Sequence, residues 1–208
     1  MKKVWKYLQK PCLVCLMTLC FLMSYKIAVK ANNISFDNWY ADSYQVGYWS
    51  QAPKVYFTNL SSAINVSTYL NNAVNKWSSA GISSSITTTS SNATIKFYGG
   101  TQSELISAGF YYTSNTAGLT YWDSYSTVAT ANSYYSIKEL TATSASVCSE
   151  IGSSYYTNVV LHEYGHALGW YGHASSTGDV MYYEATAENT SLTTHDKNHL
   201  TQVYNAMN

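Results

Sequence analysis

The stretch HEYGHALGWYGH, residues 162–173, contains three of the chain's five histidines. His162 and His166 are four residues apart, so on a helix their imidazoles lie one turn apart on the same face. Two such nitrogens are half of the ligands of a tetrahedral zinc ion. Glu163 lies about 100° around the helix from His162, which brings its carboxylate within reach of a metal-bound water. The spacing predicts a zinc site with Glu163 as general base.

The residues around this stretch predict the helix that the site needs. One side of residues 155–170 is apolar, and Gly169 supplies an end to the helix. A zinc site with two histidines still needs a third protein ligand and an open position. His173 follows seven residues after His166 and is the leading candidate. The alternative third ligands downstream are Glu184, Asp179 and His195.

The same stretch resembles the zinc signature of the metzincins, H-E-x-x-H-x-x-G-x-x-H. His162, Glu163, His166 and Gly169 match it in place, whereas the third histidine arrives one residue late, at 173 instead of 172. The resemblance implies that the chain turns back at Gly169 and offers His173 as the third zinc ligand. Loops absorb single insertions at little cost, so the delay is compatible with this role.

The segment GDVMYYEA, residues 178–185, extends the resemblance. Met181 comes fifteen residues after His166, where metzincins have a methionine turn beneath the metal. Tyr183 occupies the position at which astacins and serralysins have a tyrosine that ligates zinc and binds the reacting carbonyl, whereas matrixins usually have proline. The resemblance makes Tyr183 a candidate catalytic residue. A Thr-x-x-Asp start followed by an apolar stripe, in residues 193–204, is similar to the last helix of matrixin-like domains.

Periodicity predicts the remaining elements and an α+β fold. We expect strands at residues 54–59, 93–100 and 117–124, a helix that begins at Ser61 or Ser62 and ends at Gly81, and a last helix capped by Thr193 or Thr194. Residues 32–53 are expected to form an irregular arm, and residues 124–154 a loop with short strand pieces. The resemblance, which is specific over residues 157–204, implies a twisted mixed sheet with a backing helix, an active-site helix and a C-terminal helix.

The family likeness also implies an activity, the hydrolysis of peptide bonds within proteins with one catalytic Zn²⁺. The substrate would lie extended along the strand that contains Lys96 to Tyr98 and add a strand to the sheet. The sequence shows no calcium-type spacing, so structural Ca²⁺ is not placed.

The first 31 residues have the features of a secretory signal. Four lysines precede an apolar run from Cys12 to Met23, and Val29 and Ala31 suit a cleavage site. The run is short for a membrane span, which takes about twenty residues. A retained N-terminal anchor is the alternative. We therefore expect a secreted, extracellular chain, possibly associated with the cell surface, with one metallopeptidase domain over residues 32–208 and no stable membrane insertion.

Removal of this segment makes the chain acidic and leaves a single cysteine. Six of the eleven lysines lie within it, the chain has no arginine, and all eleven acidic residues follow it, so the net charge becomes 5 − 11 = −6. Nucleic-acid binding, which depends on a basic face, is not expected. Cys148 remains alone and excludes an internal disulfide. We expect a monomer.

Two other functional hypotheses compete with the peptidase. A catalytically weak metal-binding or adhesive surface module would keep the fold, and the displaced His173 and the many tyrosines motivate it. A gluzincin would use Glu184 as its third ligand.

Overall fold

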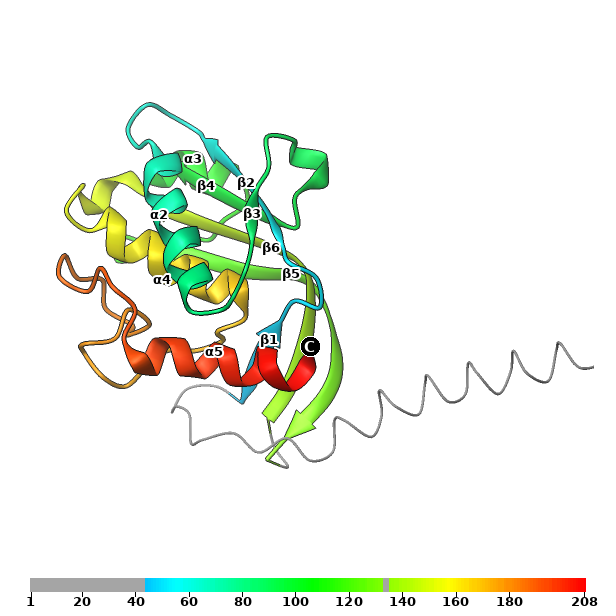
Figure 1. Cartoon of the computed structure of the whole chain (residues 1–208). Coiled ribbons are helices and arrows are strands. Elements are labelled where there is room, and N and C mark those ends of the chain that lie inside the picture. The colour runs from blue at the N-terminus through cyan, green and yellow to red at the C-terminus, as the bar shows by residue number, and fades with distance from the viewer. Residues whose placement is uncertain (1–43, 133–134) are drawn as a thin grey trace, which may run out of the picture.

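The computed structural model describes residues 44–132 and 135–208 (Figure 1). The predicted signal segment, residues 1–31, lies outside the described residues, and so do residues 32–43 of the predicted arm. The elements in chain order are β1 (Gln45–Tyr48), β2 (Lys54–Asn59), α2 (Val66–Ser79), β3 (Ser85–Ile86), β4 (Ile95–Gly100), α3 (Gln102–Ser107), β5 (Gly118–Ala131), β6 (Tyr135–Cys148), α4 (Tyr156–Leu168) and α5 (Thr194–Met207). Single 3-10 turns lie at Ser90–Asn92 and Ser149–Ile151.

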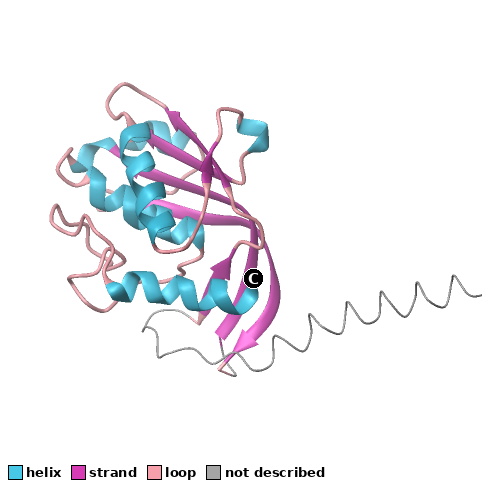
Figure 2. Ribbon diagram, in the orientation of Figure 1, coloured by secondary structure: helices cyan, strands magenta, loops and turns pink. Residues whose placement is uncertain are grey.

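The strands form one mixed sheet in the order β1-β6-β4-β2-β3, with β5 paired to β6. β6 pairs with β5 along one edge, and its other edge pairs in parallel with β1 and then with β4. The β5–β6 pair is antiparallel and the other pairs are parallel. Helices α2 and α4 lie side by side on one face of the sheet (Figures 1 and 2). The expected α+β fold, with a twisted mixed sheet and a backing helix, is confirmed.

The core lies between the sheet and these two helices. Val55, Ile95 and Phe97 are fully buried on the sheet. Leu70 and Trp77 of α2 are fully buried as well. Each such side chain stabilises the fold by about 1.5–3 kcal/mol relative to an exposed one. Helix α4 packs beside α2 and against β5 and β6, which places it next to the hairpin edge of the sheet.

The prediction of a loop over residues 124–154 is wrong, because most of this stretch belongs to the long β5–β6 hairpin. The inward side of β6 carries small as well as large apolar residues, among them Ile137, Ala145 and Val147. Serine and threonine between them blur the alternation that marks a strand. Pairing along nearly the whole length of β5 stabilises the hairpin instead. The predicted irregular arm is also partly ordered, since β1 pairs with residues 136–139.

The helix ends show both a wrong and a correct prediction. The first helix begins at Val66, not after Ser61 or Ser62, and Asn59 Oδ1 accepts a hydrogen bond from the Val66 backbone N–H at 2.9 Å. The last helix begins at Thr194 and is capped, as expected, by Thr193, whose hydroxyl accepts from the Asp196 backbone N–H in a capping box.

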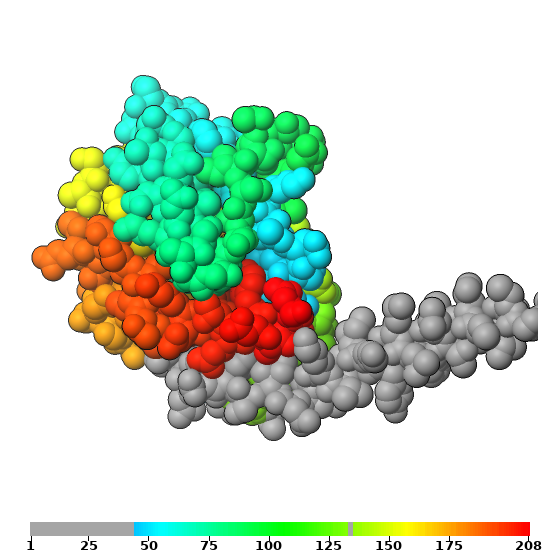
Figure 3. Space-filling model, in the orientation of Figure 1, coloured from blue at the N-terminus to red at the C-terminus, as the bar shows by residue number. Residues whose placement is uncertain are grey.

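The C-terminal part of the chain packs against the rest of the domain and shares its core. Figure 3 shows the segment between α4 and α5, in orange, and α5 itself, in red, side by side below α2. Leu200 and Val203 of α5 are fully buried in the common core, and α5 contacts β1. None of the helices in the described part of the chain has the length and apolar character needed to span a bilayer.

Candidate metal centre

Helix α4 is buried on almost every side, which gives its histidines an apolar environment. The helix contacts α2, β5 and β6, and its Leu161 carbonyl accepts a hydrogen bond from Trp77 Nε1 at 3.1 Å. Burial lowers the pKa of His162 to about 4. Burial likewise holds the pKa of His166 well below its ordinary value, with a smaller contribution from the neighbouring histidines. Both imidazoles are therefore neutral at pH 7, the form that binds metal ions.

The end of α4 is held by three aromatic side chains from distant parts of the chain. The last carbonyls of an α-helix have no partner within the helix. Those of residues 166–168 accept hydrogen bonds at 2.7–3.0 Å from Trp49, Trp122 and Tyr204. Trp49 directly follows β1, Trp122 lies on β5 and Tyr204 lies on α5. The sheet and the last helix together therefore fix the position at which α4 ends.

Gly169 ends the helix, as the sequence predicts, and no other residue fits there. Its φ is +125°, which disfavours residues with a side chain. Its carbonyl accepts a hydrogen bond from the Gly47 backbone N–H at 2.7 Å. A Cβ atom at position 169 would lie 2.1 Å from the Gly47 carbonyl oxygen. The chain thus reverses direction against β1 and returns towards the histidines.

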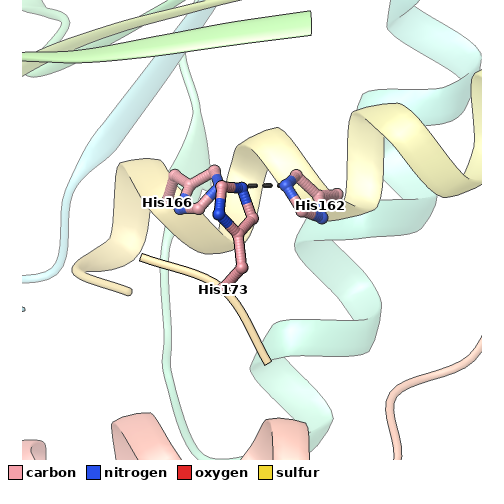
Figure 4. A group of neighbouring side chains, drawn as sticks. All are labelled: His162, His166 and His173. Atoms are coloured by element: carbon pink, nitrogen blue, oxygen red, sulfur yellow. Dashed lines mark hydrogen bonds between the residues drawn. The ribbon is translucent and has the colours of Figure 1, made fainter. Parts of the chain in front are cut away.

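The extra residue before His173 is absorbed in the turn. Gly172 has a φ of +82°, a conformation that turns the backbone between Gly169 and His173. The ring centroid of His173 lies 5.3 Å from that of His162 and 5.1 Å from that of His166. One possible donor atom from each of the three rings lies within 4.8 Å of the others. Figure 4 shows the three rings converging on one point.

The hydrogen bonds of these rings fit a cation. His162 Nδ1 lies 2.8 Å from the Val180 carbonyl oxygen, and His166 Nδ1 lies 2.6 Å from that of Trp170. A carbonyl only accepts, so each Nδ1 carries the proton and each Nε2 carries a lone pair. These two Nε2 atoms face each other at 2.9 Å (Figure 4). Two lone pairs at that distance repel unless a cation lies between them, which is the arrangement of a metal site.

The other candidate third ligands do not join this cluster. The donor group consists of His162, His166 and His173. Asp179 is buried and pairs with His195, whose Nδ1 lies 2.5 Å from its Oδ2. Glu184 lies in the wall of the cleft and outside the donor group. The geometry therefore favours three imidazoles over the gluzincin arrangement.

Met181 lies directly beneath α4 and is fully buried. A Cβ atom at Gly165 would lie 2.5 Å from the Met181 sulfur, so the glycine makes room for the methionine. The turn is fixed from below by Asp196, whose two carboxylate oxygens accept hydrogen bonds from the Val180 and Met181 backbone N–H groups at 3.0 and 3.1 Å. Because the Val180 carbonyl orients His162, the start of α5 supports the metal site through this turn.

Glu163 is buried next to the start of β5. It is 6% exposed, and its Oε2 accepts a hydrogen bond from the Thr120 hydroxyl at 2.7 Å. Burial raises the pKa of Glu163 to about 8, and the Thr120 hydrogen bond opposes part of that rise. A Cβ atom at Gly118 would lie 2.6 Å from the Glu163 Cγ, so the strand leaves space for this carboxylate. A carboxyl group with such a pKa can accept and return a proton near neutral pH.

The histidines and Glu163 line a cleft of about 770 Å³. Trp122 and Tyr171 line one part of it, and their ring centroids lie 4.8 Å apart. Tyr183 lines it as well and is 62% exposed. The neighbouring side chains of Tyr182 and then Glu184 raise the pKa of Tyr183 to about 12, so the hydroxyl keeps its proton. The structure thus places Tyr183 at the cleft, and its catalytic role stays a prediction.

The predicted position of the substrate strand needs correction. Residues 96–98 lie on β4, which pairs with β2 on one side and with β6 on the other. Both edges of that strand are occupied, so its backbone cannot pair with a substrate. Among the described strands, β5 pairs only with β6, and residues 118–120 of β5 line the cleft.

Sequence reasoning missed four residues that shape the site. Thr120 and Gly118 hold and accommodate Glu163, Gly165 accommodates Met181, and Asp196 fixes the methionine turn. Asp196 carries a sequence signal, since Thr193-x-x-Asp196 is a capping box. Gly165 lies inside the helical motif, where glycine is unfavourable and implies a close contact. Nothing in the local sequence marks Thr120 or Gly118.

The comparison with protein families agrees with this geometry. The chain matches the matrixin family over residues 49–205, a range that includes β2, α2, α4 and most of α5. No curated protein matches the chain. The matched range covers most of the sequence, with every histidine of the metal cluster inside it. The chain therefore belongs to the matrixin family, whose members are zinc metalloendopeptidases.

Proposed function

We propose that this chain is a secreted zinc-dependent endopeptidase in which His162, His166 and His173 hold one Zn²⁺ and Glu163 is the general base. One observation carries the proposal. Three imidazoles converge beside a buried carboxylate in an open cleft. A structural zinc site is closed by four protein ligands, whereas three ligands leave a position for water or substrate. Such a site suits hydrolysis better than a purely structural role.

The substrate would bind along the free edge of β5. An extended peptide adds to a strand by backbone hydrogen bonds, and antiparallel pairs are the more stable kind. The first part of β5 passes Glu163 at Gly118 and then the carbonyl of His166 at Trp122. An antiparallel peptide therefore has its amino-terminal side near Trp122 and its carboxyl-terminal side near the residues that precede Gly118.

Each group in the cleft would then have one task. When bound, zinc polarises the scissile carbonyl and lowers the pKa of a water molecule towards about 7. Glu163 takes the proton of the attacking water and passes it to the leaving amine. Thr120 holds the carboxylate in position by its hydrogen bond. Tyr183, protonated and exposed at the cleft wall, would donate a hydrogen bond to the reacting carbonyl oxygen.

Cleavage of casein by the purified chain tests the proposal. We expect proteolysis that a zinc chelator abolishes and added zinc restores. Glu163→Gln keeps the shape of the side chain but not its basicity and should lower kcat by about a hundredfold or more. Glu188→Gln, an exposed glutamate outside the cleft, is the matched control and should keep full activity. Activity that survives in Glu163→Gln at the rate of the control would refute the assigned base.

Export and oligomeric state belong to the same proposal. We propose cleavage after Ala31 and a monomeric domain outside the cell. Sequencing the amino terminus of the chain from the culture medium should give Asn32 as the first residue. A chain that remains with the cells at its full length would favour the retained anchor.

A further inference from the structure

The cleft has two chemically different ends, on either side of the three imidazoles. At one end Trp122 and Tyr171 lie close to the carboxyl end of α4. At the other end the wall consists of Asn158 and Val159, from the amino end of α4, and of residues 182–185. The first part of β5 runs past α4 in the same direction as the helix, so Gly118 lies towards the amino end of α4 and Trp122 towards its carboxyl end. A substrate antiparallel to β5 runs the opposite way, and its carboxyl-terminal side therefore lies at this second end.

Glu184 gives this second end a negative charge. Its side chain is exposed and lines the cleft, and no lysine occurs among the described residues that line it. Lys76 reaches the neighbouring segment but donates to the backbone carbonyl of Thr190. Glu184 forms no ion pair with the described residues of the chain. A carboxylate in this situation is available to a charged group of the substrate.

Aromatic rings lie beside this carboxylate. The centroids of Tyr182 and Tyr183 are 4.6 Å apart with their planes tilted by 49°. Tyr183 directly precedes Glu184 in the chain, and both side chains are exposed and line the cleft. Ring faces attract ammonium and guanidinium groups, and this attraction adds to that of a carboxylate. An exposed ring beside an unpaired carboxylate fits a cationic side chain.

The segment that carries these groups is fastened to the active-site helix. Asn158 Nδ2 donates to the Asn189 carbonyl at 2.8 Å, and its Oδ1 accepts from the Thr186 backbone N–H at 3.1 Å. Asn189 Nδ2 in turn donates to the Asp179 carbonyl at 3.1 Å. A wall held by side chains on both sides loses little freedom when a ligand binds, so its charge can discriminate between substrates.

We propose that this end of the cleft binds a lysine or arginine side chain within the first two residues on the carboxyl side of the scissile bond, with Glu184 as the specificity-determining residue. The inference rests on the proposed peptidase function and names its substrate class, which is basic peptides and proteins. The acidic character of the chain agrees with it, since the described residues contain five lysines and nine acidic side chains.

A matched pair of quenched fluorescent peptides tests the proposal. The peptides contain one cleavage site found in casein and differ only in the first two residues after the cut, which are lysine in one peptide and the uncharged norleucine in the other. We expect a kcat/KM ratio of about fivefold in favour of lysine, the size of an exposed ion pair combined with a cation–π contact. The preference should weaken as salt is added, because the pair is exposed.

Three variants assign this preference to its residue. Glu184→Gln keeps the size and shape of the side chain but not the charge and should bring the ratio to about one. Glu184→Lys should reverse it, and Glu188→Gln, on the same segment but outside the cleft, should leave it unchanged. A change in kcat that affects both peptides equally cancels in the ratio. Binding of the same two peptides to Glu163→Gln, measured by fluorescence anisotropy, should show the same preference without turnover.

The outcomes separate this inference from the function on which it rests. A chain that cleaves neither peptide nor casein contradicts the peptidase proposal. A chain that cleaves both peptides equally well, or that keeps its lysine preference in Glu184→Gln, overturns the role of Glu184 and leaves the peptidase assignment standing.

Discussion

The hydroxyl of Thr120 donates a hydrogen bond to Oε2 of Glu163 at 2.7 Å, and it lies 3.0 Å from the Glu163 backbone carbonyl as well. Thr120 belongs to β5 and Glu163 to α4, so this contact joins the strand that would bind substrate to the residue that would move the proton. The position of the base therefore depends on the position of the edge strand.

Thr120→Val tests this dependence, because valine keeps the branched shape and removes the hydroxyl. We expect kcat to fall by about tenfold with little change in KM, since the carboxylate loses its orientation but the strand keeps its edge. Thr120→Ser restores the donor and should restore kcat. Steady-state kinetics on a casein-derived peptide measures both constants. A rise in KM alone, or a serine variant as slow as valine, would show that Thr120 acts only through the structure of the strand.

His173→Ala tests the metal cluster. Native mass spectrometry of the wild-type chain should show one zinc ion per molecule. Loss of one of three imidazoles should weaken zinc binding by about a hundredfold or more, which competition with a chelator measures. His195→Ala is the matched control, because His195 pairs with Asp179 and lies outside the donor cluster. Equal zinc affinity in the two variants would remove His173 from the ligand set.

Gly165→Ala tests the packing of the methionine turn against α4. The added Cβ would lie 2.5 Å from the Met181 sulfur and 2.8 Å from a ring carbon of Trp77, so we expect a loss of about 1–3 kcal/mol in the free energy of unfolding. Gly178→Ala is the control, since its nearest neighbour would be the Ser176 hydroxyl at 3.9 Å. Urea unfolding of both variants gives the comparison. An alanine at 165 that stabilises the chain, as helix propensity alone favours, would contradict the observed packing.

The sequence predicts the parts of the site that depend on local spacing. The helical period brings His162 and His166 together, and a glycine after the apolar run predicts the end of α4 at Gly169. A Thr-x-x-Asp pattern predicts Thr193 as the cap of α5. The approach of His173 to the other two rings follows from a turn that the residue count alone left open.

The parts that were missed depend on contacts between distant segments. The sequence pointed to β4 as the strand that binds substrate, but β4 is enclosed between β2 and β6, and β5 is the edge strand beside the active site. The order of strands in a sheet cannot be predicted from the sequence of any one strand. The long hairpin was missed for a related reason, since β6 contains many small polar residues and gains its stability from pairing. Thr120 acts on Glu163 across 43 positions of sequence, which no local pattern reveals.

His199 provides a prediction about acid stability. It is 4% exposed and stacks on Trp170 with ring centroids 3.7 Å apart, and burial together with the nearby His195 holds the pKa of His199 well below its ordinary value of 6.5. The unfolded chain binds a proton at this residue below about pH 6.5 and the folded chain does not, so folding stability is unaffected above that pH. Below it, His199 should cost up to about 1.4 kcal/mol per pH unit until the folded pKa is reached.

Protonation of the buried histidines of the metal cluster also destabilises the folded chain in acid. The variants His199→Phe and His199→Gln remove only the contribution of His199, so comparison with the wild type isolates it. Urea unfolding at pH 7.5 and pH 5.5, with a chelator present throughout, gives the pH dependence of each chain. We expect the wild type to lose about 1 kcal/mol more than either variant between these two pH values. Phenylalanine keeps the stacked ring, and glutamine keeps the polar atoms. Because the two variants change the packing differently, a pH effect that both lose in the same way comes from the missing imidazole and not from packing. Equal losses in the wild type and both variants would mean that His199 accepts its proton in the folded chain as readily as in the unfolded one.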